Sequence, residues 1–224
     1  MYAKYHIETT AWVLQRNFSP RALKQVIEAN LAQDSIKDLF LSSDSYRHFC
    51  NDTITTGLDY VEEQHRLIEQ LAGLSKEQVD KPTELAHRQR IALGRLLHTV
   101  QDFYSHTNYV DLWLREHHTE QTPIIDVIDG LDQALLTHYE LRTAHWFALE
   151  ILFHIPLIGA LLRRIWLPPH SHEAMHLDSP ERGLRFVYSM IMAQQRTAKE
   201  YQRAVKAIIR QGGSEALHCF HQEG

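Results

Sequence analysis

The sequence has only two cysteines and lacks both a long uninterrupted apolar run and a strand-like pattern. Cys50 and Cys219 are too few for a thiolate zinc site and form no C-x-x-C motif, so we expect two free thiols. No apolar run reaches the roughly 20 residues that a membrane-spanning helix needs. Alternating apolar and polar residues, internal repeats and low-complexity linkers are also missing. These absences leave helix as the expected secondary structure.

Charge and motif content exclude several classes of function. The net charge is −5 and no basic stripe is present, so we expect no specific nucleic-acid binding. No G-x-S-x-G motif, Walker loop or dinucleotide fingerprint occurs. The first ten residues, MYAKYHIETT, show no basic-then-apolar signal pattern. We therefore expect a cytoplasmic protein or one exported by a route other than Sec.

The composition predicts one all-α domain that spans residues 1–224. Apolar residues make up 44% and charged residues 23% of the chain, as in globular proteins with a real core. Capping and proline signals predict helix starts at Ser19-Pro20, about Thr53, Thr83, Thr122-Pro123 and Ser179-Pro180, and glycine predicts helix ends at Gly73 and Gly212-Gly213. The chain also holds 16 histidines, which is unusual because histidine is the commonest metal ligand.

Three polar residues in the segment 94–114 stand four residues apart. His98, Asp102 and His106 therefore form one column on a 3.6-residue helix, and Gly94 continues this column one turn earlier. The opposite face is apolar. Imidazole nitrogen and carboxylate oxygen are good zinc ligands, so the column predicts a divalent metal site. The alternative is a set of ordinary helical surface pairs.

The segment 144–167, AHWFALEILFHIPLIGALLRRIWL, is apolar on nearly all sides but is broken by polar residues and proline. Two interpretations stay open, a buried helical hairpin or an element that lies in a lipid interface. In the second interpretation Trp146, Leu162 and Trp166 contact lipid, and two arginines at 163 and 164 meet headgroups.

A zinc site takes three or four ligands, and one helix face cannot supply them all. Further candidates outside the column are His6, Asp52, His65, His172 and Asp178. Taken singly, each has an ordinary interpretation as a solvated loop histidine or a carboxylate at a helix start. Together they favour a metal centre.

The segment LGRLLHTVQDFYSHTNYVDLW, residues 93–113, resembles the signature of the Het-C family, which is similar to bacterial zinc-dependent phospholipases C and single-strand-specific zinc nucleases. In the phospholipase pattern a ligand histidine follows a His-Phe pair by 17 residues, and here His65 follows His48-Phe49 by 17. His172 stands six residues before Asp178-Ser179-Pro180, as in Het-C-type endings. His6 matches an early ligand histidine.

Three departures from the pattern affect individual roles. The final His-x-x-x-Glu pair of the phospholipases is replaced by the longer spacing from His172 to Asp178. The phospholipases use their N-terminal amine as a ligand, whereas five residues precede His6 here. Strict spacing also places the catalytic aspartate at Asn51, whereas the carboxylate of this chain is one position later, at Asp52. His138 and His176 are spare candidates for the last ligand positions.

The resemblance implies a zinc-dependent phosphodiester hydrolase with two or three zinc ions, most simply a phospholipase C that uses metal-activated water. It implies one metal held by His65, His98 and Asp102, with Asp52 as a ligand or general base. A second metal would use His106, His172 and Asp178, and a third would involve His6. The expected partner is a phospholipid or another phosphodiester, with peripheral membrane contact. The alternatives are a zinc nuclease or phosphatase, and a non-catalytic metal-stabilised interaction module.

Overall fold

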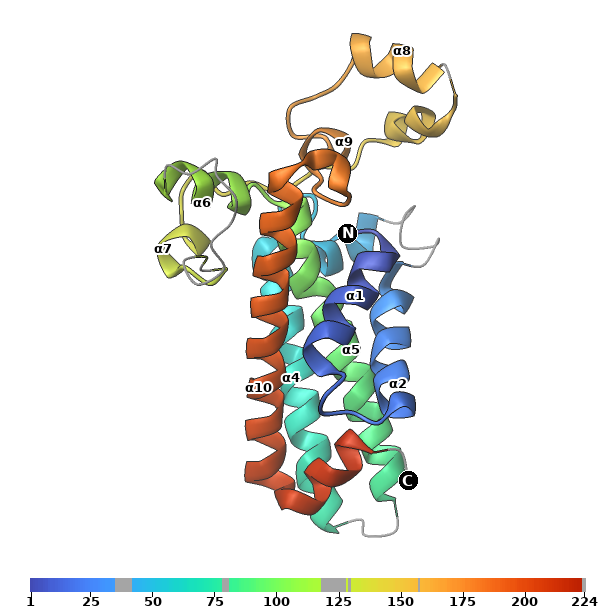
Figure 1. The fold of residues 1–224 in the computed structure, drawn as a ribbon, viewed down its shortest axis with the longest axis vertical. Helices are drawn as coiled ribbons and strands as arrows, with labels where there is room; N and C mark the ends of the chain where they lie inside the picture. Colours follow the sequence, from blue (N-terminus) through green and yellow to red (C-terminus); the bar gives the residue numbers. More distant parts are fainter. Residues whose placement is uncertain (35–41, 78–80, 118–127, 129, 157, 223–224) are drawn as a thin grey trace.

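The protein is all-α, as the sequence predicts, and its fold is known from a computed structural model (Figure 1). The structure describes residues 1–34, 42–77, 81–117, 128, 130–156 and 158–222. The helices are α1 Ala3–Leu14, α2 Pro20–Leu31, α4 Ile54–Glu77, α5 Pro82–His106, α6 Tyr109–His117, α7 Gln133–Leu136, α8 Ile158–Ile165, α9 His172–Met175 and α10 Leu184–His221, with 3-10 turns η1 Ala32–Asp34, η2 Ser42–His48, η4 Ala148–His154 and η5 Pro180–Arg182. Within these ranges no strand forms, and two isolated bridges join Thr107 to Thr143 and His145 to Ser171.

Helix α5 is the centre of the fold, and α2, α4 and α10 pack along it (Figure 1). Every residue from Leu96 to His106 is buried. The apolar side of α5 meets the core residues Leu14, Val26, Val61, Ile68 and Ile208. The polar column therefore faces the protein interior as well, where ionisable groups need partners because water cannot solvate them.

The predicted helix boundaries agree with the structure in part. Ser19 caps α2, and its Oγ accepts a hydrogen bond from the backbone N–H of Ala22 at 3.3 Å. Helix α4 continues past Gly73 to Glu77, so the predicted end was wrong. Gly213, with φ 79° and ψ −170°, is not helical and separates two helical stretches within α10, so the end predicted at Gly212-Gly213 is confirmed and a second stretch follows it directly. The start predicted at 122–123 lies outside the described residues.

Two lobes extend from one end of the bundle (Figure 1). Helices α6 and α7 form one lobe, which packs on α10 through buried aromatic residues such as Trp113 and Tyr188. The 3-10 turn η4 and helix α8 form the other, here called the apolar lobe and defined as residues 146–167. Throughout the described part of the chain, no helix combines the length and apolar character needed to span a bilayer.

Gly94 allows α2 to approach α5 closely. A Cβ atom at this position would overlap the carbonyl oxygen of Val26 and lie 2.7 Å from the Cβ of Ala29 and 2.9 Å from the backbone nitrogen of Asn30. The close approach expected at this glycine is therefore made by a helix of the same chain. It also places Asn30 beside the polar column of α5.

We predict that Gly94→Ala destabilises the protein by about 1–3 kcal/mol, because the added methyl group pushes α2 away from α5. Urea unfolding monitored by circular dichroism measures the change. Gly73→Ala is the matched control. A Cβ there meets nothing within 4 Å, so removing a glycine from the α4 interior should raise stability by roughly 0.5–1 kcal/mol. Equal stability of the two variants would contradict the role given to Gly94.

Candidate metal centre

The first group of candidate ligands comes from three elements that meet near the end of α5. Asp34 of η1, His48 of η2, and His98 and Asp102 of α5 each offer one atom, and these atoms all lie within 4.8 Å of one another. His98 and Asp102 are fully buried, His48 is half-buried, and Asp34 is exposed. The group is therefore open on the side of Asp34.

The second group consists of His106, the last residue of α5, together with His172 of α9 and Asp178. The Nε2 atom of His106 lies 3.2 Å from Nε2 of His172 and 3.2 Å from Oδ1 of Asp178. The two groups adjoin, because Nδ1 of His106 is 3.6 Å from Oδ2 of Asp102. The polar column of α5 thus contributes to both groups.

The carboxylate of Asp102 lies at the centre of the cluster. Its Oδ2 is 2.8 Å from Nδ1 of His48 and 3.2 Å from Nε2 of His98, and its Oδ1 is 3.2 Å from Nε2 of His6. The amino group of Met1 donates to the same Oδ1 at 2.6 Å and lies 2.9 Å from Oδ1 of Asp178. One buried positive group thus bridges carboxylates of both ligand groups.

Hydrogen bonds orient three imidazole rings so that one nitrogen of each faces the cluster. Nδ1–H of His98 donates to Oδ1 of Asn30 at 3.3 Å, and Nδ1–H of His6 donates to Oε1 of Gln101 at 2.7 Å. Nδ1–H of His106 donates to the backbone carbonyl of His48 at 3.1 Å. In the neutral ring each Nε2 atom is then left with a lone pair. For His106 this requires loss of a proton, because Asp102 and Asp178 raise its pKa well above the ordinary value. Metal-binding histidines are held in this way, through the nitrogen that does not bind the metal.

Gln101 is itself fixed by two hydroxyl groups. Its Nε2 donates to Oγ1 of Thr10 and of Thr197, both at 3.1 Å, and its Oε1 also accepts from Asn30 at 3.1 Å. The amide cannot rotate without breaking these bonds, because all four residues are buried. The orientation of His6 and His98 therefore depends on one buried network that spans α1, α2, α5 and α10.

Electrostatics in the cluster set the protonation states of its groups. Burial alone would raise the pKa values of Asp102 and Asp178, but the Met1 amino group and His106 hold both well below the ordinary value. Burial also opposes the charge on Met1, yet the carboxylates raise the pKa of its amino group to about 11. Burial lowers the pKa of His98 to about 4 and that of His172 well below its usual range. The carboxylates are thus anionic, and these two imidazoles are neutral, at pH 7.

The donor atoms fit a divalent metal. Neutral imidazole and anionic carboxylate are the protonation states that zinc requires. Among the residues that the structure describes, the buried Nε2 of His6 has no hydrogen-bond partner although it faces Asp102. The Nε2 atoms of His106 and His172 face each other at 3.2 Å, as do Nε2 of His98 and Nδ1 of His48 at 3.1 Å. A cation between such nitrogen atoms would bind their lone pairs, and at His106 it would displace a proton, since metal binding needs the neutral ring.

The structure places two of the predicted site residues away from both groups. Nε2 of His65 lies 2.7 Å from Oε2 of Glu200, a buried pair between α4 and α10. Asp52 is 67% exposed, and its Oδ2 lies 3.2 Å from Nε2 of His145. His138, a spare candidate, accepts a hydrogen bond from the backbone of Glu140. The structure does not bring these residues into the cluster.

Sequence reasoning did not include Asp34 and His48 among the ligands. The position of Asp34 depends on how α2 packs against α5, and no local pattern marks it. In the sequence, His48 served only as the reference point for the 17-residue spacing to His65. A further signal lies in the backbone that follows it, because Phe49, Asn51 and Asp52 have φ values of 52°, 57° and 59°. Strained backbone of this kind gathers at functional sites.

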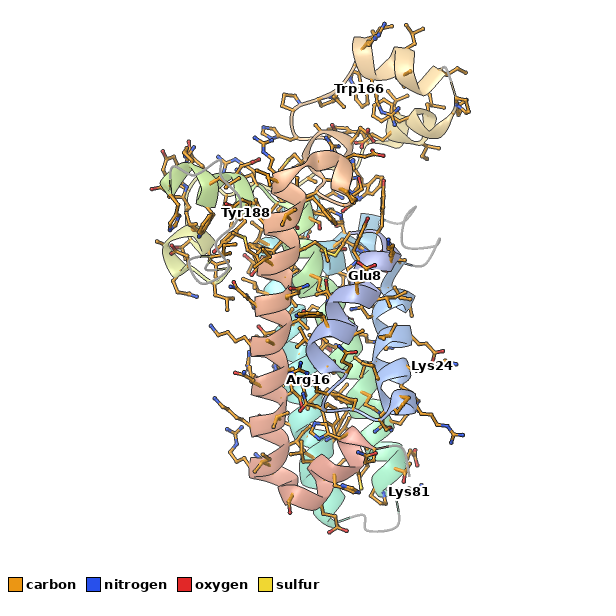
Figure 2. All side chains as sticks on the ribbon, viewed as in Figure 1. Glu8, Arg16, Lys24, Lys81, Trp166 and Tyr188 are labelled. Atoms are coloured by element: carbon orange, nitrogen blue, oxygen red, sulfur yellow. The ribbon has the colours of Figure 1, made fainter. Side chains whose placement is uncertain are left out.

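The apolar lobe stands beside the second group. The ring of Trp146 stacks on His172 with 3.9 Å between ring centroids. Leu162 is half-buried, and Trp166 packs against Phe147 inside the lobe (Figure 2). The other large apolar side chains of the lobe are mostly exposed and include Leu149, Ile151, Ile155, Ile158, Leu161 and Ile165. A fully buried hairpin is therefore not what the structure shows.

Fold and site together define an all-α protein with two adjoining His/Asp groups suited to metal binding. Comparison with protein families assigns it more closely. Residues 5–123, just over half of the chain, match the VWA7 N-terminal domain, and the protein belongs to this family. The matched range includes His6, His98, Asp102 and His106 but ends before His172 and Asp178. Searches of curated proteins and of solved structures found no match.

We predict that Gln101→Met lowers zinc affinity by about 10- to 100-fold, because His6 and His98 lose the network that orients them. Competition with a chromophoric zinc chelator measures the affinity. Gln195→Met is the control. The Gln195 amide also makes two part-buried hydrogen bonds, donating to the carbonyl of Ile128 and accepting from the N–H of Gly130, but it lies outside the network. An equal change of affinity in both variants would show that Gln101 has no specific effect on the metal site.

Proposed function

We propose that the protein is a zinc-dependent phosphodiester hydrolase of the phospholipase C class. The observation that carries this proposal is the adjacency of the two His/Asp groups, with His106 of one group 3.6 Å from Asp102 of the other. Paired metal sites are typical of enzymes that cleave phosphate esters. The Het-C-like segment of residues 93–113 supports the same conclusion.

Seven side chains would hold two zinc ions. Asp34, His48, His98 and Asp102 would hold one, and His106, His172 and Asp178 the other, while His6 on the far side of Asp102 stays a predicted ligand of a third. Bound zinc would activate a water molecule and stabilise the charge of the phosphate oxygens. The chain itself orients the imidazoles through Asn30 and Gln101 and shields His172 with Trp146.

Asp52 is the proposed general base. It belongs to neither ligand group, so its carboxylate is not committed to a metal. The backbone N–H of Asp52 donates to Thr143 at 2.7 Å, and its Oδ2 faces His145 at 3.2 Å. His145 pairs with the backbone beside His172 through the bridge to Ser171. Through His145, Asp52 is therefore joined to the backbone next to His172, a residue of the second group.

The apolar lobe supports phospholipid as the substrate class. Leu149, Ile158, Leu161 and Ile165 are half or more exposed, and the lobe protrudes at the end of the bundle that holds the ligand groups (Figure 1). Monomeric proteins rarely expose apolar side chains so densely without a partner surface. A lipid interface would bury these side chains and bring the phosphodiester layer to the candidate metal centre.

Metal content and turnover test the proposed function together. We predict two or three equivalents of zinc, by elemental analysis, in protein purified from zinc-replete medium, and release of the phosphorylated headgroup from phospholipid. Asp102→Asn should lose about one equivalent or more of zinc and melt at a lower temperature, because metal binding contributes to folding. Asp52→Asn should keep its zinc and lose roughly 10²- to 10⁴-fold in rate.

Asn51→Ala is the matched control for Asp52, since it alters the same loop without removing a carboxylate, and it should change the rate much less. Less than one equivalent of zinc in the parent would refute the metal centre. Full zinc loading without hydrolysis of any phospholipid or nucleotide diester would instead indicate a metal-stabilised interaction module.

We predict that Leu161→Ser and Ile165→Ser leave the melting temperature nearly unchanged, because these side chains are 60% and 74% exposed. Both variants should bind anionic liposomes at least several-fold more weakly, since burying one such side chain contributes about 1.5–3 kcal/mol. Flotation of protein with liposomes measures binding. The control is Ile209→Ser on α10, which removes a large apolar side chain, 48% exposed, far from the lobe. Equal binding by all variants would exclude the lobe as the lipid contact.

A further inference from the structure

A second polar site lies in the bundle, away from the candidate metal centre. It is a cavity of about 1190 Å³ between α4, α5 and α10, closed at one side by residues near α7. Its lining includes His65 and Glu200, the buried pair that does not join the metal groups. The lining contains no residue of either candidate ligand group, and the cavity has no role in the proposed hydrolase activity.

The lining changes in character along the bundle. Near the start of α4 it is apolar and includes Phe49, Ile54, Leu58, Val100 and Phe103. Further along α10 it is cationic and includes Arg196, Lys199, Arg203, Lys206 and Arg210. From Gln195 to Arg210 the lining follows α10 for about 22 Å at 1.5 Å per residue. The cavity is therefore long, with one apolar end and one positively charged end.

The charge of the lining opposes that of the whole protein. Six lysines and arginines line the cavity against two glutamates, whereas the chain has a net charge of −5. Arg196, Arg203 and Arg210 each pair with a glutamate, namely Glu200, Glu62 and Glu69. Arg66, Lys199 and Lys206 make no ion pair with any residue that the structure describes. Positive charge is therefore left over for an anionic ligand.

His65 is a buried polar residue in the lining of the cavity. Only 5% of the residue is exposed, its Nε2 contacts Glu200 at 2.7 Å, and its buried Nδ1 has no hydrogen-bond partner in the described structure. Glu200 is also bound by Nε of Arg196 at 2.5 Å. Buried polar atoms are nearly always satisfied. His65 lines the cavity, and its Nδ1 is therefore an unsatisfied polar atom beside the proposed ligand site.

We propose that this cavity binds a single-chain anionic amphiphile, with its carboxylate or phosphate headgroup at the cationic end and its alkyl chain at the apolar end. Ligand sites of this kind combine an apolar wall with a few polar groups that fix the orientation. Lys199 and Lys206 attract the headgroup, and Ile54 and Leu58 contact the alkyl chain. The site is independent of the proposed hydrolase and needs no metal.

The test uses dodecyl phosphate and dodecanoate below their micellar concentrations, with dodecyltrimethylammonium as the probe of opposite charge. Calorimetric titration should show binding of both anionic probes, with and without zinc, and no binding of the cationic probe. The double variant K199E/K206E should bind the anionic probes at least 10-fold more weakly. Both lysines are exposed, so the variant is expected to fold. Lys24→Glu on α2, outside the cavity, should bind like the parent.

Photo-crosslinking locates the bound chain. A dodecanoate that carries a terminal diazirine should label peptides of α4 or α5 that line the apolar end, and Leu58→Asp should reduce this labelling. Labelling confined to the apolar lobe would overturn the proposal, because it would indicate adsorption to the exposed surface. Equal binding of the cationic probe, no binding of the anionic probes, or unchanged binding by K199E/K206E would also overturn it. Loss of binding only when zinc is removed would assign the probes to the metal centre instead.

Discussion

The carboxylate of Asp102 is the constraint on which the rest of the structure depends. It is buried in the middle of a helical bundle, where an isolated charge would be unstable by several kcal/mol or more. Nδ1–H of His48 and the Met1 amino group donate to it, and they come from the end of η2 and from the residues before α1. The start of α1, the end of η2 and the central helix must therefore meet at this point. Removal of one partner would leave the others around an uncompensated charge, so the arrangement specifies one packing of these segments.

The local pattern of α5 could be predicted from the sequence, because a helix that repeats every 3.6 residues aligns His98, Asp102 and His106 without help from the rest of the chain. The all-α class follows in the same way, and the structure confirms it. Asp34 could not be predicted, since its place depends on the contact of α2 with Gly94. His65 shows the converse limit. Its spacing from His48 matches a family pattern, yet the direction in which α4 presents it depends on α10 and on Glu200.

Helix boundaries depend on local signals and on packing. A cap such as Ser19 acts through a hydrogen bond to a residue three positions later, and the signal is therefore local. A glycine such as Gly213 only permits a change of direction, and the packing decides whether the helix ends or turns. In α10 the residues after the kink return to the bundle, where Phe220 is fully buried against Phe18. Burial of that aromatic side chain favours a kinked continuation over an open end.

The apolar lobe is joined to the candidate metal centre by polar contacts as well as by stacking. The buried carboxylate of Glu150 accepts hydrogen bonds from the backbone N–H of Phe147 and from that of Glu173 on α9, at 3.2 and 2.8 Å. Arg163 of α8 pairs with the side chain of Glu173 at 2.8 Å. Since His172 precedes Glu173, the same short helix carries a candidate ligand and the anchor of the lobe. A force that moves the lobe would therefore act on His172 through covalent and hydrogen-bonded neighbours, and the exposed apolar surface and the ligand group must be considered as one structural unit.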